Sequence, residues 1–135
     1  MNDQLMALLK KHEGCSLVLY LDTVGKQTIG WGHNIQDRGL TQSQVDEVLV
    51  DDEAEHEANV RAVFPEFDSF SVNRQNALID MMFELGPGEF STFQKMIADV
   101  HVGDWASAAS EMRNSYWAVQ VPGRVAEDAG LLENG

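Results

Sequence analysis

The first forty residues change from a helical pattern of apolar positions to one typical of strands. Apolar residues recur with helical spacing over residues 3–12, and Gly14 follows in the position of a helix C′ residue. Residues 17–32 are rich in valine, leucine, tyrosine and isoleucine on both sides of a turn at residues 24–26, which predicts a β-hairpin. Glycines on both sides of Trp31 indicate a bend or a close approach of the backbone.

The rest of the chain has the pattern of a helical protein. Thr41 to Gln44 form a capping-box sequence, so a helix is expected from Gln42 to about Val63, before Pro65. From Ser71 on, apolar stripes at helical spacing predict a core formed by helices. Further helices are expected from Ser71 to a stop at Gly86-Pro87-Gly88, around Phe93 to Val100 before Gly103, after a cap at Asp104, and, as a last short helix, from Pro122.

Together these elements predict one α+β domain over residues 1–135. We expect a sheet lobe over about 13–40 and a helical lobe built from 1–12 and about 60–135. The helix over about 41–63 is long enough to connect the two lobes. A chain of 135 residues can bury one core but is too short for two independent domains.

Composition narrows the possible partners. The net charge of −13 argues against unaided binding to nucleic acid or to an anionic membrane surface. No run approaches the ~18 apolar residues of a membrane-spanning helix, and the N-terminal bases follow the apolar residues, so we expect neither a membrane anchor nor a secretory signal. The single cysteine, Cys15, excludes an intrachain disulfide and is interpreted as a small buried residue.

Glu13, Asp22 and Thr28 are the candidate catalytic residues. Cleavage of a glycosidic bond needs a carboxyl group that protonates the leaving oxygen, and usually a second one that activates water or attacks the sugar. Glu13, where the first helix meets the hairpin, could be shielded from water by the sheet, while Asp22 beside an open turn would stay ionised. Thr28 could hold a water beside Asp22. The two acids are a weak signal by themselves, since the chain has 22.

The run HEGCSLVLYLDTVGKQTIGWGH resembles the signature of glycoside hydrolase family 24, the bacteriophage T4-type lysozymes. The family pattern is an EG pair, an apolar run ending in Y-x-D-T, a glycine and TIG-x-GH, and the chain has each part. The spacings from Glu to Asp and from Asp to Thr, nine and six residues, also match. The resemblance extends over most of the chain, through LTQSQVDEVLVDD (the long inter-lobe helix), MMFELGPGEFSTF (the larger lobe) and WAVQVPGR (the tryptophan segment facing the cleft).

The resemblance implies a lysozyme-like fold with an active-site cleft between the sheet lobe and the helical lobe. The implied reaction is hydrolysis, with inversion, of the β-1,4 bond between N-acetylmuramic acid and N-acetylglucosamine in bacterial peptidoglycan. Glu13 would be the general acid, and Asp22 and Thr28 would position the attacking water. His33 would pair with Asp52 across the lobe junction.

The resemblance also implies weaker assignments. Trp117, Gln120 and Arg124 are candidates for substrate contacts on the cleft wall, although Trp117 also fits a place in the core and Arg124 could instead bridge toward Glu13. No metal and no organic cofactor are implied, and a monomer is expected. As a phage endolysin, the protein would accumulate in the host bacterial cytoplasm and would need a holin, a separate pore-forming partner, to reach the periplasm and the cell wall.

Two departures from the family leave alternatives open. The segment from His33 to Leu40 is shorter than in the best-known member, and the chain is strongly acidic where many phage lysozymes are basic. These differences leave room for a non-catalytic peptidoglycan-binding module. A lytic transglycosylase would need Glu13 but not Asp22 and Thr28, so their presence disfavours that reaction. The density of the match disfavours an unrelated α+β domain.

Overall fold

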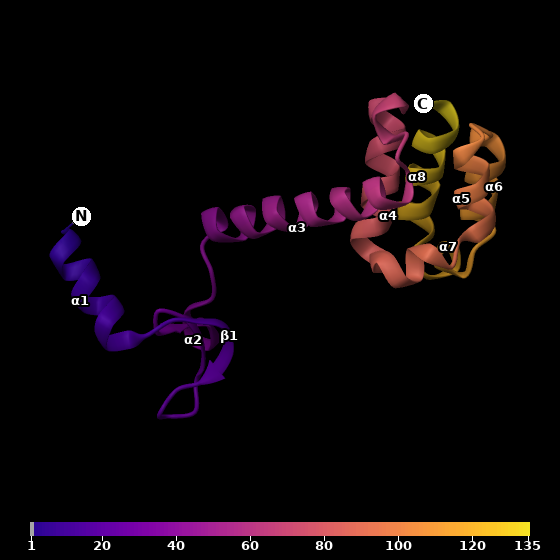
Figure 1. Cartoon of the computed structure of the whole chain (residues 1–135). Helices are drawn as coiled ribbons and strands as arrows, with labels where there is room; N and C mark the ends of the chain where they lie inside the picture. Colours follow the sequence, from indigo (N-terminus) through magenta and orange to yellow (C-terminus); the bar gives the residue numbers. More distant parts are fainter. Residues whose placement is uncertain (1) are drawn as a thin grey trace. The chain divides into compact units, whose positions relative to one another are not determined.

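The structure is a computed structural model that describes residues 2–135. The chain divides into two compact units, Met1–Glu47 and Val48–Gly135, and each is described by itself. Helix α3 (Gln42–Val63) begins in the first unit and continues in the second (Figure 1). The lobe boundaries expected from the sequence stay predictions.

The first unit opens with the predicted helix. The side chain of Asn2 caps α1 (Asp3–Glu13) by accepting hydrogen bonds from the N–H groups of Gln4 and Leu5 at 3.0 and 3.2 Å. Gly14 ends the helix at φ 68°, a backbone conformation that glycine adopts without strain, and its N–H donates to the Lys10 carbonyl. Glu13 is therefore the last helical residue, one beyond the stretch 3–12 expected from the sequence.

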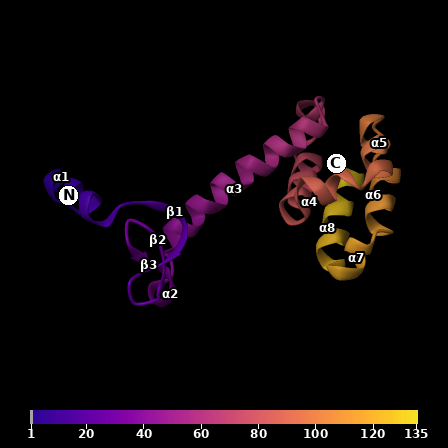
Figure 2. The same ribbon diagram turned by 60° about the horizontal axis from the view of Figure 1, so that its bottom comes forward.

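A small antiparallel sheet follows, with strand order β1-β2-β3. Strands β1 (Ser16–Leu21) and β2 (Gln27–Gly30) form the predicted hairpin, and β3 (His33–Asn34) leads into the short helix α2 (Ile35–Arg38) (Figure 2). Thr28 lies on the middle strand, opposite Tyr20 on one side and Asn34 on the other. The sequence did not predict β3 and α2, because two and four residues are too few to show a period.

Both hydrogen bonds of the predicted capping box are present at the start of α3. The N–H of Gln44 donates to Thr41 Oγ1 at 3.2 Å, and the N–H of Thr41 donates to Gln44 Oε1 at 2.8 Å. Two N–H groups that a helix terminus leaves unpaired are thereby satisfied. The helix predicted over 42–63 has those bounds in the structure.

Helices pack around the core of the second unit. A short 3₁₀ turn, η1 (Phe67–Ser69), precedes α4 (Val72–Ser91), and α8 (Pro122–Asn134) lies between α4 and α6 in both views (Figures 1 and 2). The remaining helices are α5 (Gln94–His101), α6 (Trp105–Arg113) and α7 (Tyr116–Gln120). The side chain of Asp104 caps α6 through the Ser107 N–H, as predicted.

Two expectations about these helices need correction. The helical backbone breaks at Gly86 (φ 75°, ψ 168°), but Pro87 starts a further helical stretch that ends at Ser91, because proline is well tolerated in a first turn. Pro122 does open the last helix, which has 13 residues and is not short. Helix α7 was not predicted, since its five residues are also too few for a clear period.

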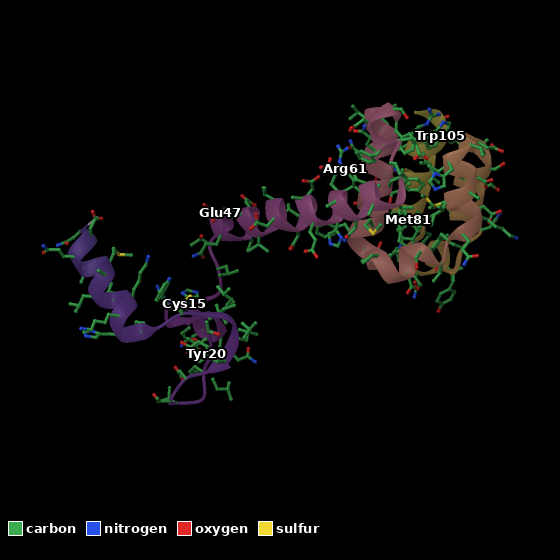
Figure 3. All side chains as sticks on the ribbon, viewed as in Figure 1. Cys15, Tyr20, Glu47, Arg61, Met81 and Trp105 are labelled. Carbon is green, nitrogen blue, oxygen red and sulfur yellow. The ribbon has the colours of Figure 1, made fainter. Side chains whose placement is uncertain are left out.

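Apolar and aromatic side chains at helical spacing form the core, as predicted. Phe64 packs edge to face against Phe70 and Phe90, and Met81 is fully buried among the helices of this unit (Figure 3). Cys15, expected to be buried, is exposed. Over residues 2–135, no helix has both the length and the apolar character that crossing a membrane requires.

Candidate active site

Glu13 lies against the turn between β2 and β3. A methyl group placed on Gly32 would lie 2.6 Å from Glu13 Oε2 and 3.2 Å from the carboxyl carbon, so only a hydrogen fits there. Gly32 also has φ +73°, which disfavours any other residue. One turn back along α1, Lys10 Nζ lies 5.3 Å from the centre of the Trp31 ring. The end of the helix thus meets the turn at two adjacent positions, and Glu13 itself remains exposed.

Asp22 and Thr28 are joined by one backbone oxygen at the hairpin turn. The carbonyl of Lys26 accepts from the Asp22 N–H and from the Thr28 hydroxyl, both at 2.9 Å. In return, Asp22 Oδ1 accepts from the N–H groups of Val24 and Lys26 at 3.0 and 2.8 Å. Within the first unit as described, residues 2–47, no hydrogen bond engages Asp22 Oδ2, so this oxygen is open to accept a proton or a water.

Thr28 is only 2% exposed, because it lies on the middle strand. Its hydroxyl hydrogen points to the Lys26 carbonyl, which leaves the oxygen as an acceptor. Polar contacts of α2 hold the same end of the sheet. Lys26 Nζ lies 3.3 Å from Asp37 Oδ2, and the N–H of Gln27 donates to Gln36 Oε1 at 3.1 Å.

His33 begins β3 and donates from Nε2 to the Gly39 carbonyl at 2.6 Å, since a carbonyl can only accept. The bond ties the sheet to the end of α2. It leaves Nδ1 as the ring nitrogen open to a further partner. The pair with Asp52, which belongs to the second unit, stays a prediction.

The second unit holds the three candidate substrate residues. Trp117 is buried, at 3% exposure, and its indole N–H donates to Glu84 Oε2 at 2.9 Å. Arg124 Nη1 lies 3.3 Å from the same Glu84 oxygen, and its Nε and Nη2 donate to the two carboxylate oxygens of Asp80 at 2.7 and 2.9 Å. Gln120 is exposed at the end of α7, where it lines a groove together with Trp117.

Sequence reasoning missed the acids that organise this region. Asp80 stands between apolar residues in LIDMM, and Asp128 stands in the apolar stripe of α8, so both interrupt a core face. An acid at such a position was the available signal. The sequence gives no sign of the role of the Lys26 carbonyl, because every residue type has the same backbone carbonyl. In the part of the chain that the structure describes, no three His, Cys, Asp or Glu side chains gather where they could hold a metal ion.

Comparison with known proteins identifies the family. The family model described as phage lysozyme matches residues 10–133. A probable T4-type lysozyme 2 of Dictyostelium discoideum is 27% identical, with all of this chain aligned to 96% of the relative. That alignment spans 167 positions, more than this chain has residues, so the relative carries segments that this chain lacks.

Two phage proteins are also similar. An endolysin of Acyrthosiphon pisum secondary endosymbiont phage 1 is 29% identical over 95% of this chain and 87% of its own length. The pre-baseplate central spike protein Gp5 of Enterobacteria phage T4 is 25% identical over 99% of this chain but only 28% of its own length. The match of the family model over most of the sequence shows that this chain belongs to the phage lysozyme family and is a glycoside hydrolase of the lysozyme class.

Proposed function

We propose that the chain hydrolyses the β-1,4 bond between N-acetylmuramic acid and N-acetylglucosamine in peptidoglycan, with inversion at the sugar carbon. Glu13 is the general acid that protonates the leaving oxygen. Asp22 is the base that takes a proton from the attacking water, which Thr28 helps to position. The observation that carries this proposal is the placement of Glu13 at one end of β2 and of the Asp22–Thr28 pair at the other.

The spacing along β2 leaves room for a water between the two acids. Thr28 and Gly32 are four residues apart, so at ~3.3 Å per residue their backbones are separated by at most ~13 Å. The side chains of Glu13 and Asp22 shorten this distance but start from opposite ends of the strand. Inverting enzymes hold their carboxyl groups ~6.5–9.5 Å apart to admit a water, whereas retaining enzymes hold them ~5–5.5 Å apart.

The open oxygen of Asp22 fits the role of base. Because Oδ1 is engaged by two N–H groups, the carboxylate is fixed in orientation while Oδ2 can accept from a water. Thr28, on β2 beside this turn, adds a second acceptor, because its own hydrogen is committed to the Lys26 carbonyl. A water bound by both oxygens would be oriented for attack on the sugar.

We also propose substrate contacts in the second unit. A groove of about 490 Å³ is lined by aromatic and polar side chains, including Tyr116, Trp117 and Gln120. Such a lining suits a glycan with an attached peptide, since aromatic faces cover sugar rings and amides bond to hydroxyl and peptide groups. Contact of Arg124 with substrate or with Glu13, the His33–Asp52 pair and the cleft between the lobes stay predictions.

The relatives are compatible with two roles for this chain, a separate endolysin or a part of a larger phage protein, and we propose the first. The endolysin is covered over most of its length by this chain, whereas the spike protein is covered over about a quarter. The endolysin among the relatives supports our proposal that the chain acts in host cell lysis, and we propose that it does so as a monomer. It would be made in the host bacterial cytoplasm and reach the cell wall with the help of a holin.

Product analysis tests the proposed reaction. Purified Gram-negative peptidoglycan is digested, and the new sugar ends are identified by mass spectrometry and by NMR of the anomeric proton. We expect reducing N-acetylmuramic acid ends that form first as the α anomer, because water replaces a β bond with inversion. Anhydro ends would show a lytic transglycosylase instead, and binding without any new ends would show a non-catalytic module.

Replacing Gly32 with alanine should impair the site. The added methyl group would meet Glu13 Oε2 at 2.6 Å, so the carboxyl group must move, and the positive φ adds about 1–2 kcal/mol of strain. We expect at least a ~10-fold loss in the rate of turbidity decrease of outer-membrane-permeabilised Gram-negative cells.

The matched control for this variant is Gly103→Ala. Gly103 has φ +74° but no atom within 4 Å of an added methyl group, so it carries the same backbone strain without the contact to a carboxyl group. It should lose similar thermal stability and keep the wild-type rate. Equal rates in the two variants would show that the position of Glu13 does not depend on Gly32.

A further inference from the structure

A pair of carboxyl groups at the contact of α4 with α8 has no part in the proposed reaction. Asp80 of α4 and Asp128 of α8 line one pocket at this contact, together with Arg124. Two ionised carboxylates cannot bond to each other, because both only accept, so a hydrogen bond between them requires one proton. Asp128 is 4% exposed, and its Oδ2 has no hydrogen-bond partner within residues 2–135.

The nearby arginine does not neutralise both acids. Arg124 donates from Nε and Nη2 to Asp80, and its Nη1 faces Glu84. Within the described residues it makes no hydrogen bond to Asp128. The geometry therefore supplies one cation for Asp80 and Glu84 and leaves Asp128 to be buried as a neutral acid.

We propose that Asp80 and Asp128 hold one proton between them, and that the contact of α4 with α8 is a pH-sensitive link which weakens when this proton is lost. Loss of the proton to water leaves two carboxylates side by side. One of them is buried without a hydrogen-bond donor. The repulsion between the two charges and the cost of burying one of them are both relieved if α8 moves away from α4.

The charged groups around the pair support this reading. Asp80 of α4 lines one pocket with Asp128, and so do Arg124 and Glu127 of α8 itself. On α6, which also packs against α8, Arg113 is paired with Glu133 at the far end of α8. Helix α7 contributes no Asp, Glu, Lys, Arg or His. Two acids and one already engaged arginine thus surround Asp128.

The pKa directions agree with the geometry. Burial raises the pKa of Asp128 to about 8, together with the hydrogen bond to Asp80 and its negative charge, against the opposing effect of Arg124. Burial also raises the pKa of Asp80, but the hydrogen bonds from Arg124 and Asp128 outweigh it, so that pKa is lowered. The proton of the pair therefore belongs to Asp128.

The sign of the effect on stability follows from proton binding. In the unfolded chain, Asp128 ionises near its ordinary value of 3.8, whereas in the folded protein it keeps its proton up to about 8. Between these values the folded state binds more protons than the unfolded state. The contribution of Asp128 to stability therefore falls as the pH rises from about 4 to about 8.

The test combines a titration of the wild type with a variant. Carbon-13 NMR of the Asp128 carboxyl carbon should show a midpoint near 8, and melting temperatures are measured from pH 5 to 9 under reducing conditions. Asp128→Asn keeps a donor toward Asp80 but cannot titrate. Over this range the wild type should lose about 5 °C or more beyond any loss in Asp128→Asn. Glu55→Gln removes an exposed acid of α3 that does not act on Asp128, and this variant should behave as the wild type does.

Either of two results would overturn the proposal. One is a titration of the Asp128 carboxyl group near pH 4, which would show that it is ionised in the folded protein. The other is a parallel decline of the melting temperatures of the wild type and Asp128→Asn. If Asp128→Asn does not fold, the wild-type titration decides alone.

Discussion

Glu13→Gln should abolish lysis of permeabilised Gram-negative cells, with a fall in rate of at least ~10³-fold. Glutamine has nearly the same shape but cannot donate a proton to the leaving oxygen, and general acid catalysis contributes about 10²–10⁴-fold. Without a proton donor, the sugar oxygen must leave as an alkoxide, which is a poor leaving group. The measurement is the initial rate of turbidity decrease, with released reducing ends as a second readout.

Two further measurements show that the loss is chemical. Glu13→Gln should still bind purified peptidoglycan and should melt close to the wild-type temperature, because Glu13 is exposed. The matched control is Glu47→Gln, a change of the same kind at an exposed position of α3, which should keep full activity. If Glu13→Gln lowered the turbidity at the wild-type rate, the assignment of Glu13 as the acid would be disproved.

Phe64→Ala should produce the largest loss of stability among single changes in the second unit. The ring is fully buried and packs against Phe70, Phe90 and His101, with ring centres 5.1–6.3 Å apart. Truncation of a buried phenylalanine costs about 3–5 kcal/mol, through lost burial and the cavity that remains. We expect the melting temperature to fall by at least ~10 °C, measured by circular dichroism at 222 nm.

The control for Phe64→Ala is Val72→Ala, because Val72 is 68% exposed at the start of α4. This change should alter the free energy of unfolding by no more than about 0.5 kcal/mol. A small effect of Phe64→Ala, similar to that of Val72→Ala, would mean that the aromatic cluster does not form the centre of this core.

The sequence was sufficient for features that depend on local chemistry. The capping box at Thr41, the glycine turn of the hairpin and the proline that starts α8 each use one residue type for one local geometry, and each lies where it was expected. The backbone break at Gly86 was also expected. The helical stretch after it was not, because the same proline that ends one helix can begin the next.

Features that depend on contacts between distant residues could not be predicted. Glu13 was chosen as a candidate from its place at a helix end and from the resemblance to the T4-type lysozymes, but its contact with Gly32 requires the folded turn. Burial of Asp128 beside Asp80 depends on how α8 packs against α4, and no local rule places two acids together in a core. The exposure of Cys15 is a similar case, since a small sulfur side chain gives no sign of which face it occupies.

The bridge between Asp22 and Thr28 has a consequence for how the protein can vary. The bridging atom is the main-chain oxygen of Lys26, so residue 26 can change its side chain without disturbing the bridge. The charge at position 26, next to the reacting groups, can therefore change in evolution or by mutation without loss of the bridge. Proline is the exception, because it would remove the N–H that orients the Asp22 carboxylate.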